Sequence, residues 1–516
     1  MTTKPHARNA SFLATTLLGF SSLVSALQPC DIYASGGTPC VAAHSTTRSL
    51  YEKFNQPLYQ LRRNSDDTRL DVKPLSVGGV ANGAAHDTFC SGTTCLITII
   101  YDQSGQGNHL RKAPPGSAAN GTEPGGYDNL ASGGGAPVTL NGKKAYGVFV
   151  SPGTGYRNND ARGTAKDDQP EGMYAVLDGT HFNGRCCFDY GNVETDTVDS
   201  GGGRMETIYF GLGDGSPSSG SGSGPWIMAD LENGLFTGYD PGNNPGNPTL
   251  DSRFVTAVVK GEPHHWSIRG GNAASGALST FYDGQRPAPN NRFGVPNSWD
   301  PMRKQGAIVL GVGGDNSNKA QGTFYEGVLT SGYPSSKIED AVQANIIAAK
   351  YAIAPLTSGP ALSVGSSISI HATTSCCTKD YLTQTGNQVT LQVVNSGSSA
   401  ALKKQASWIV RTGLGNAGCF SFESKNSPNS FIRHSDFQLH VDANDGSKLF
   451  SEDATFCPQL SLNGKGTSFR SWSIPTHWWR HYAGLGYLAT NGGVHVYDSK
   501  TLFNDDISWV VSASFA

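Results

Sequence analysis

Short apolar runs separated by turn residues dominate the first two thirds of the chain. Apolar and polar positions alternate in them, β-branched residues are frequent, and Gly, Asp or Asn residues lie between them. The runs span residues 94–102, 144–150, 172–179, 205–213, 225–232, 253–261, 264–271, 306–314 and 322–332. This pattern is typical of strands in an antiparallel β-sandwich. A βα barrel would need about eight helices, and very few windows show helical spacing.

The clearest helical window, IEDAVQANIIAAKYAIA, is followed by a segment rich in Pro, Ser and Gly, PLTSGPALSVGSS. A helix followed by such a connector indicates a domain boundary. We therefore predict a first domain over residues 27–355 and a second over residues 356–516.

The second domain contains an internal repeat. The segments KKQASW (403–408), SEDATF (451–456) and FNDDISW (503–509) each end on an aromatic residue, at intervals of 48 and 53 residues. Three copies of all-β sequence of this length predict a three-fold pseudosymmetric β-trefoil.

The three copies differ at polar positions. Asp453 and Asp506 precede the aromatic of the second and third copies by three residues, where the first copy has Gln405. Upstream, the second and third copies carry Arg433-His434 and Arg480-His481, which we align with Lys379-Asp380 in the first. Asp and His near aromatic rings can bind sugar hydroxyls. Capping of turns by the two aspartates explains the pattern equally well.

The N-terminus resembles a secretory signal peptide. Lys4, His6 and Arg8 precede the apolar run FLATTLLGFSSLV, and Ser25 and Ala26 form a small-residue cleavage context. The run is too short and too interrupted to span a membrane. We expect residues 1–26 to be removed and the mature protein, starting near Leu27, to be secreted.

Composition narrows the choice of partners. The chain has 65 Gly, 27 Pro and only 15% charged residues, with a formal net charge of −3. A mild acidic balance without charge blocks argues against nucleic acid and anionic membranes, and favours a neutral ligand. The sequon Asn120-Gly-Thr predicts N-glycosylation in a secreted protein. We expect a monomer.

Ten cysteines include the adjacent pairs Cys186/Cys187 and Cys376/Cys377. A disulfide between neighbours constrains almost none of the unfolded chain, and spacing alone favours cysteines that are unpaired or pair elsewhere. If the other six cysteines pair locally, however, only the two adjacent pairs are left, and bonding within each of them would use all ten cysteines. Those six are Cys30 with Cys40, Cys90 with Cys95, and Cys419 with Cys457.

Two acidic residues stand out in the first domain because each ends an apolar strand at a Gly-rich turn. They are Glu232 in PWIMADLENGLF and Asp315 in GAIVLGVGGDNSN. Hydrolysis of a glycosidic bond needs one carboxylate as nucleophile or base and another carboxyl as acid. Asp230 would share the face of Glu232 and tune it or bind hydroxyls. Alternatively, Glu232 and Asp315 are ordinary exposed turn acids.

Long motifs resemble the fungal α-L-arabinofuranosidases of glycoside hydrolase family 54, with their appended family 42 carbohydrate-binding module. The resemblance covers essentially the whole mature chain. Its motifs include TCLITIIYDQSGQGNHL, KAYGVFVSPGTGYRN, CCFDYGN, GPWIMADLEN, GGDNSNKAQGTFYEGVLTSGYPS, SFIRHSDF, EDATFC, TNGGVHVYD and FNDDISW.

The resemblance implies a concanavalin-like β-sandwich, a β-trefoil that binds arabinose, and retaining cleavage of terminal α-L-arabinofuranosyl residues from arabinoxylan, arabinan and related plant cell-wall polysaccharides. It implies no metal or organic cofactor. Glu232 would be the nucleophile and Asp315 the acid/base. The implied substrate-binding residues are Asp230, Asn233, Gly314, Met205 and the disulfide Cys186–Cys187 as the pocket floor.

In the trefoil, the resemblance implies arabinose pockets at His434 with Asp453 and at His481 with Asp506, with Gln405 in an inactive lobe. It also implies the disulfide Cys419–Cys457. A bond between Cys376 and Cys377 would be an addition to the family pattern.

Two segments depart from that pattern. The loop GDGSPSSGSGS lacks the tryptophan that the family places before GPWIM, and Trp226 is a candidate substitute. The segment GQRPAPNNRFGVPNSWDPM forms an enlarged loop before Asp315. Two alternatives remain open, namely a non-catalytic lectin of the same fold and a glycosidase for xylosides or galactosides.

Overall fold

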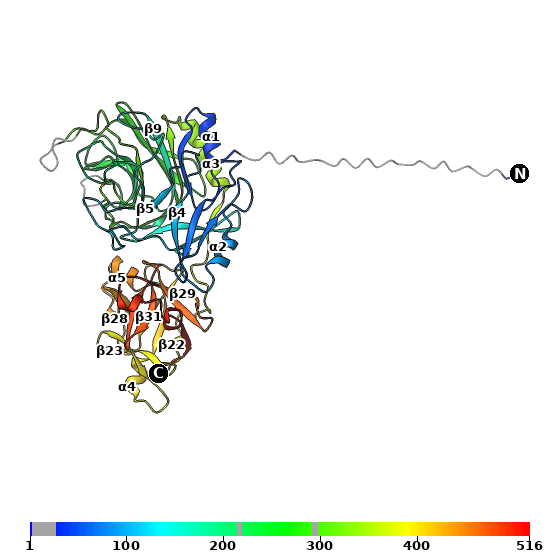
Figure 1. Ribbon diagram of the computed structural model, residues 1–516, viewed down its shortest axis with the longest axis vertical. Helices are drawn as coiled ribbons and strands as arrows, with labels where there is room; N and C mark the ends of the chain where they lie inside the picture. The colour runs from blue at the N-terminus through cyan, green and yellow to red at the C-terminus, as the bar shows by residue number, and fades with distance from the viewer. Residues whose placement is uncertain (3–26, 214–218, 291–297) are drawn as a thin grey trace.

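The computed structural model describes residues 1–2, 27–213, 219–290 and 298–516 (Figure 1). The predicted signal segment therefore lies almost entirely outside the described residues. So do parts of two loops noted in the sequence, residues 214–218 of GDGSPSSGSGS and residues 291–297 of the enlarged loop.

Two large antiparallel sheets form the N-terminal part of the described chain. The first runs in the order β18-β17-β16-β9-β20-β7-β6-β21, with β1 paired to β20, and the second in the order β14-β13-β11-β10-β19-β8-β5-β4-β2-β3. The strands of the first are β1 (Cys40–Ser45), β6 (Ala136–Leu140), β7 (Lys143–Val150), β9 (Glu171–Phe182), β16 (Phe254–Glu262), β17 (His265–Asn272), β18 (Ser279–Gln285), β20 (Gly322–Ser331) and β21 (Tyr351–Ile353). Those of the second are β2 (Tyr59–Arg63), β3 (Arg69–Val72), β4 (Cys95–Ile100), β5 (Leu110–Lys112), β8 (Tyr156–Asn158), β10 (Asp189–Val193), β11 (Glu206–Gly211), β13 (Trp226–Asp230), β14 (Leu235–Phe236) and β19 (Ala307–Leu310). The predicted β-sandwich is confirmed.

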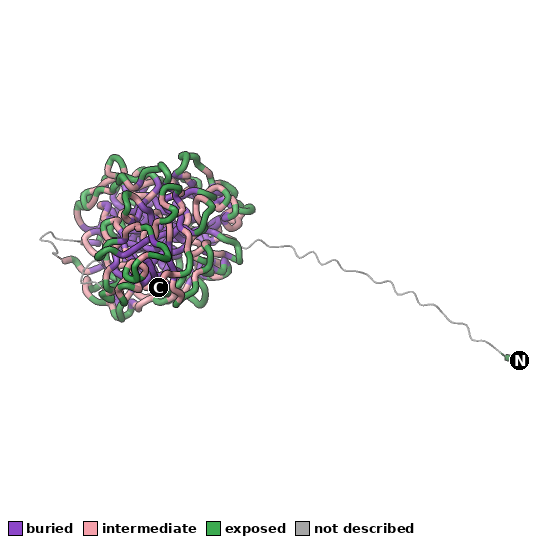
Figure 2. Tube along the Cα trace, turned by 90° about the horizontal axis from the view of Figure 1, so that it is seen from below, coloured by how far each residue is buried: buried purple, intermediate pink, exposed green. Residues whose placement is uncertain are grey.

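One continuous hydrophobic core joins the two sheets. Figure 2 shows buried residues at the centre of the molecule and exposed ones around its rim. The central strands β9 and β20 are buried along nearly their whole length. Both their faces are covered because the outer face of the first sheet carries helices α1 (Pro29–Ser35) and α3 (Ser336–Ala348). Buried Glu339 of α3 pairs with Lys260 of β16 and Arg269 of β17, which anchors that helix.

Helix α3 confirms the predicted helix before the connector, but it is shorter than the apolar window. Lys350 has a φ of 51°, a left-handed conformation that turns the chain. The following residues form strand β21, which pairs with β6. Two smaller elements complete this part, helix α2 (Gly83–Phe89) and the parallel pair β12 (Ser219–Ser221) and β15 (Asn243–Pro248).

The C-terminal part, here called the module, is a separate sheet with its own core. Its strands are β22 (Ser367–Ala372), β23 (Asp380–Thr385), β24 (Gln388–Val393), β25 (Trp408–Thr412), β26 (Phe420–Ser424), β27 (Ser430–Ser435), β28 (Gln438–Ala443), β29 (Phe456–Leu460), β30 (Thr467–Ser471), β31 (Trp478–Tyr482), β32 (Leu485–Ala489) and β33 (Trp509–Ala513). Its helices are α4 (Ala400–Gln405), α5 (Lys448–Asp453), α6 (Phe503–Asp506) and the 3-10 turn η2 (Val496–Asp498). The predicted boundary at residues 355/356 falls between β21 and β22.

The three-fold repeat of the module is confirmed. Helices α4, α5 and α6 end at Gln405, Asp453 and Asp506, and a strand that begins on a fully buried aromatic follows each helix. The repeat is therefore a helix that delivers one polar side chain, followed by a ring that fills the shared core.

Our alignment of Lys379-Asp380 with the two Arg-His pairs is wrong. In the strand register, Gln384 pairs with Val389 as His434 pairs with Leu439 and His481 with Gly486. Thr383-Gln384 is therefore the equivalent pair in the first copy.

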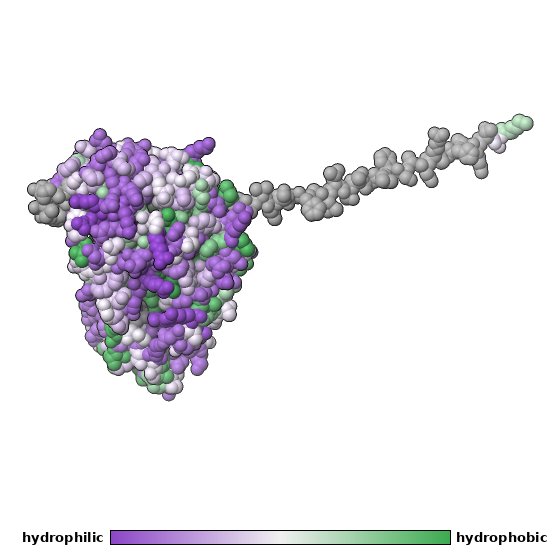
Figure 3. Space-filling view, turned by 45° about the horizontal axis from the view of Figure 1, so that its top comes forward, coloured by the Kyte–Doolittle hydropathy of each residue, from purple (hydrophilic) through white to green (hydrophobic). Residues whose placement is uncertain are grey.

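The module packs directly against the sandwich (Figure 1). Gln321 donates a hydrogen bond to Glu452 at 2.9 Å, and Ser151 donates to the carbonyl of Ser473 at 2.7 Å. The ring of Trp472 lies against Phe149 and His181. On the face shown in Figure 3, hydrophilic residues dominate and hydrophobic ones form small scattered patches. Among the described residues, no helix is long and apolar enough to cross a membrane.

Candidate active site

Glu232 lies in the tight turn that joins β13 to β14. Asp230 pairs with Leu235, and both Glu232 and Asn233 adopt left-handed φ angles, 64° and 56°. Non-glycine residues rarely take this conformation, and they concentrate at functional sites when they do. The indole nitrogen of Trp299 donates to the carbonyl of Glu232 at 3.1 Å, so the described end of the enlarged loop supports this turn.

The Glu232 carboxylate accepts hydrogen bonds from three backbone N–H groups in the loop after β10. Oε1 accepts from Ser200 at 2.9 Å and Gly201 at 3.0 Å, and Oε2 accepts from Arg204 at 3.1 Å. Burial raises the pKa of Glu232 above its usual value, and the backbone donors oppose that shift. Glu232 is 3% exposed, so it is a buried carboxylate held in a fixed orientation.

Asp315 lies in the loop that follows β19. Its Oδ1 accepts from the backbone N–H of Ser317 at 2.9 Å, and Gly313 N–H donates to the Ser317 carbonyl at 3.0 Å. The N–H of Cys187 donates to that same carbonyl at 3.0 Å. The loop of Asp315 is thus fastened to the cysteine pair, and Asp315 itself is only partly buried.

Both acids line one cavity of about 190 Å³, which we call the catalytic cavity. This is below the range of roughly 300–1,000 Å³ typical of sites for drug-sized ligands, and suits a single small ring. Every residue that the sequence analysis assigned to substrate binding lines it, namely Asp230, Asn233, Gly314, Met205, Cys186 and Cys187. The structure brings these residues together, and their individual roles stay predictions.

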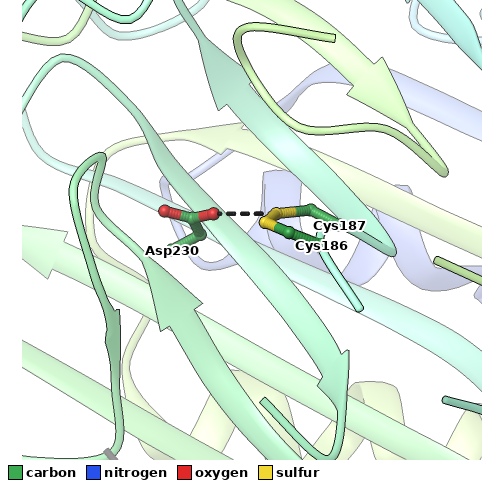
Figure 4. A group of neighbouring side chains, drawn as sticks. All are labelled: Cys186, Cys187 and Asp230. Carbon is green, nitrogen blue, oxygen red and sulfur yellow. Dashed lines mark hydrogen bonds between the residues drawn. A yellow bond between two sulfur atoms is a disulfide. The ribbon is translucent and has the colours of Figure 1, made fainter. Parts of the chain in front are cut away.

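Cys186 and Cys187 form a disulfide across a cis peptide bond directly before β10. Figure 4 shows the Asp230 carboxylate directed at the two sulfur atoms, and Oδ2 lies 3.4 Å from Sγ of Cys187. Among the described residues this is the one group with the spacing of a metal site. Because both sulfurs are bonded to each other, they are not thiolate ligands.

Sequence reasoning missed Asp199, which lines the cavity, and two buried acids, Asp189 at the start of β10 and Glu194 just after its end. Glu194 lines the catalytic cavity. Burial and the neighbouring charge of Asp230 raise the pKa of Asp189 well above its usual value. The run CCFDYGNVE placed both acids beside the cysteine pair, and that proximity was the available signal.

Trp226 does not line the catalytic cavity. It packs with Tyr209, Met228 and Leu235 in a cluster that includes Cys187, and its indole nitrogen donates to the Ser221 carbonyl at 3.0 Å. Trp226 therefore supports the disulfide from within the fold, and it does not replace the missing tryptophan of GDGSPSSGSGS.

Two clusters of buried Asp and His side chains occupy equivalent positions in the second and third copies of the module repeat, and we call them the second and third pockets. In the second pocket, Nε2 of His434 lies 3.2 Å from Asp453 and 3.3 Å from the hydroxyl of Ser473. Burial lowers the pKa of His434 to about 4 and raises that of Asp453 to about 7. Both shifts favour neutral side chains, as expected for a pocket that takes an uncharged ligand.

In the third pocket, the Thr374 hydroxyl lies 2.9 Å from Nε2 of His481 and donates to Asp506 at 2.9 Å. Arg480 adds a 2.8 Å salt bridge to Asp506. The sequence analysis did not assign the hydroxyls of Ser473 and Thr374. Both follow their strand by two residues, at matching positions in the repeat.

The first copy has amides at these positions. The Gln384 amide donates to Gly386 and Ser427 and accepts from Ser424 at 2.6 Å, so local hydrogen bonds consume it. The first copy thus has neither Asp nor His at these positions, and its inactivity stays a prediction.

Cys376 and Cys377 are bonded to each other, and they lie just after Thr374 of the third pocket. Their loop spans ten residues from Ala372 to Leu382, whereas the equivalent loop from Ser471 to Trp479 spans eight. The cysteine pair thus sits in a two-residue insertion beside a sugar-pocket candidate.

The remaining predicted pairs are also bonded, Cys30–Cys40, Cys90–Cys95 and Cys419–Cys457. Asn120 is exposed, as a glycosylation site requires, and its modification stays a prediction.

A β-sandwich whose small cavity is lined by Glu232, Asp315 and three further acids, followed by a trefoil with two buried Asp–His clusters, is typical of a glycoside hydrolase with a carbohydrate-binding module. The model of the α-L-arabinofuranosidase B catalytic domain matches residues 29–352, and that of the α-L-arabinofuranosidase B domain matches residues 370–511. The chain belongs to the α-L-arabinofuranosidase B family, glycoside hydrolase family 54, and is an α-L-arabinofuranosidase.

Relatives match along the whole chain. The probable α-L-arabinofuranosidase B of Aspergillus clavatus is 63% identical over all of both chains. An α-L-arabinofuranosidase of Hypocrea jecorina is 64% identical over 98% of this chain and 99% of its own. A family 54 structure soaked with a cyclic sulfate inhibitor has a TM-score of 0.92 and 59% identity, covering 95% of this chain and all of that one. The same values hold for an arabinofuranosidase complexed with arabinofuranosyl-α-1,2-xylobiose.

Proposed function

We propose that this chain is a secreted, retaining enzyme that removes terminal non-reducing α-L-arabinofuranosyl residues from arabinoxylan, arabinan and related plant polysaccharides. The observation that carries the proposal is the catalytic cavity, where Glu232 and Asp315 line the same small space. Retaining glycosidases need two carboxyl groups close together, one as nucleophile and one as acid/base. A small cavity also suits exo action on a single terminal ring.

Each acid has a stated task in this mechanism. The Glu232 carboxylate attacks the anomeric carbon while Asp315 protonates the departing glycosidic oxygen, giving an arabinosyl ester on Glu232. Asp315 then deprotonates a water that attacks the same carbon, and arabinose leaves with its configuration retained. Asp230 and Asn233 bind hydroxyls of the ring, and the Cys186–Cys187 disulfide packs beneath it.

The module holds the enzyme on the polysaccharide through its second and third pockets. Their Asp, His and hydroxyl groups can accept and donate hydrogen bonds to adjacent sugar hydroxyls. The related enzyme solved with arabinofuranosyl-α-1,2-xylobiose supports an arabinosylated xylan as one substrate.

One assay tests the activity against its rivals. The purified enzyme is compared on nitrophenyl α-L-arabinofuranoside, β-xyloside and galactoside, and NMR follows the anomeric configuration of the first product. We expect arabinofuranoside cleavage to dominate, with retention. Inversion would reject the mechanism, faster xyloside cleavage would indicate a different glycosidase, and no cleavage would indicate a lectin.

Secretion rests on the N-terminal pattern and the five disulfides. Expression in a fungal host followed by N-terminal sequencing of the medium protein tests it. We expect a mature chain that starts near Leu27 and elutes as a monomer in size-exclusion chromatography.

A further inference from the structure

Glu194 lines the catalytic cavity together with Glu232, Asp315, Asp230 and Asp199, and the proposed mechanism gives it no task. It follows β10 and is 1% exposed. Its carboxyl group lies so close to Gly314 that a Cβ atom there would be 1.8 Å from Oε2. Because Gly314 directly precedes Asp315, this acid lies between the two proposed catalytic loops.

The carboxyl groups of Glu194 and Glu232 line the same catalytic cavity and lie within hydrogen-bonding range of each other. Two carboxylates cannot hydrogen-bond to each other unless one of them carries a proton. Three backbone N–H groups point at Glu232, whereas Oε2 of Glu194 is buried without a hydrogen-bond partner in the described structure. Three backbone donors on Glu232 against one on Glu194 favour charge on Glu232 and the proton on Glu194.

The surrounding charges agree with this assignment. Burial, followed by the charge of Glu232, raises the pKa of Glu194 to about 9. The backbone N–H of Glu194 itself and then Arg157 of β8 oppose that shift, and the Arg157 guanidinium donates to the backbone carbonyls of Glu194 and Gly314. On the Glu232 side, the negative charge of Asp199 raises the pKa, and Asp230 accepts a bond from the Glu232 backbone N–H. Asp315 lines the same cavity.

We propose that Glu194 is a positioning residue that keeps its proton and donates it in a hydrogen bond to the Glu232 carboxylate. The bond holds the nucleophile ionised and fixed in orientation before attack. In the second step it stabilises the Glu232 carboxylate as that group leaves the anomeric carbon. This inference rests on the proposed role of Glu232 as nucleophile.

Two substitutions of similar size separate this role from simple packing. Glu194→Gln keeps an N–H donor but cannot ionise, and Glu194→Met fills the space without a donor. The measurement is the pH profile of kcat/KM on 4-nitrophenyl α-L-arabinofuranoside. Its acid limb reports protonation of the free-enzyme nucleophile, since a protonated Glu232 cannot attack.

Removing a donor destabilises the ionised form of Glu232 and raises its pKa, so the acid limb should move to higher pH. For Glu194→Met we expect a shift of about 1–2 pH units, the size expected when a hydrogen bond to a charged group is lost. Glu194→Gln should keep the acid limb within about 0.3 units of wild type.

An equal loss of kcat/KM at every pH in Glu194→Met, with the acid limb unmoved, would overturn the inference. The inference would also be overturned if the acid limb of Glu194→Gln moved to higher pH as far as that of Glu194→Met. If Glu194→Met fails to fold, Glu194→Asp replaces it. The shorter side chain moves the donor away from Glu232, so the acid limb of the kcat/KM profile should also move to higher pH. Full activity in Glu232→Gln would instead reject the proposed function itself.

Discussion

The carboxylates of the catalytic cavity and of the module pockets have different hydrogen-bonding and charged partners. In the third pocket, Asp506 is paired with Arg480 and hydrogen-bonded to Thr374, so its charge is satisfied before any ligand arrives. Glu232 is held by backbone N–H groups and a neighbouring acid, and among the described residues no salt bridge reaches it. A pocket that only binds can neutralise its carboxylate, whereas a nucleophile must stay ionised and available.

The largest expected effect is on the catalytic side of this comparison. Asp315→Ala should lower kcat/KM on an alkyl α-L-arabinofuranoside by about 10²–10⁴-fold, the usual contribution of general acid–base catalysis. On a dinitrophenyl arabinofuranoside, the first step should survive because that leaving group needs no protonation. Stopped-flow kinetics checks this as a burst of dinitrophenolate. Equal losses on both substrates would argue against Asp315 as the acid.

Gly314→Ala should also damage the cavity strongly. The added Cβ would lie 1.8 Å from Oε2 and 2.7 Å from Cδ of Glu194, so either that side chain or the Gly314 backbone must shift. Displacing the adjacent Asp315 loop by about 1 Å can cost about 10²-fold in activity. Gly397→Ala, where the nearest atom is Oδ1 of Asn395 at 3.3 Å, is the matched control. Wild-type activity in Gly314→Ala would show that the contact between these loops is not needed.

Substitutions in the module pockets should weaken polysaccharide binding and leave hydrolysis of small substrates nearly unchanged. Asp453→Ala and Asp506→Ala should each weaken retention on insoluble arabinoxylan, and together they should nearly abolish it. Pull-down and affinity electrophoresis measure the retention, and hydrolysis of the soluble nitrophenyl substrate is the internal comparison. Gln405→Ala is the control from the first copy and should change little. An equal loss on the soluble substrate would contradict the division between cavity and pockets.

The two adjacent-cysteine disulfides offer the smallest and most selective contrast. Replacing Cys186 and Cys187 by Ser should lower arabinofuranoside hydrolysis more than it lowers the melting temperature, because that pair lines the catalytic cavity. Replacing Cys376 and Cys377 by Ser should leave hydrolysis intact and weaken retention only through the third pocket, so the loss should appear in an Asp453→Ala background. The same phenotype from both replacements would remove the contrast.

Much of this organisation was predictable because burial leaves a clear pattern in the sequence. Alternating apolar runs predicted the sandwich, and recurring aromatics such as Trp408 and Trp509 predicted the trefoil. Glu232 and Asp315 stood out because strand ends and glycines frame them.

The rest depends on contacts between distant segments. Glu194 looks like any acid after a strand until β10 and β13 bring it beside Glu232. The first-copy alignment was four residues off because the spacing from the strand pair to the end of the following helix differs among the copies, 21 residues from Gln384 to Gln405, 19 from His434 to Asp453 and 25 from His481 to Asp506. No local pattern reveals such a shift before the strand register is known.

The most direct test of the account is to identify the residue that carries the sugar. Asp315→Ala lacks the base for the second step, so the arabinosyl ester should accumulate when this variant is incubated with a dinitrophenyl arabinofuranoside. Intact-mass spectrometry after rapid acid quench should show one added arabinosyl group, and peptide mapping should place it on Glu232. A label on Glu194, Asp230 or another residue, or no label despite a dinitrophenolate burst, would contradict the assignment of Glu232 as the nucleophile.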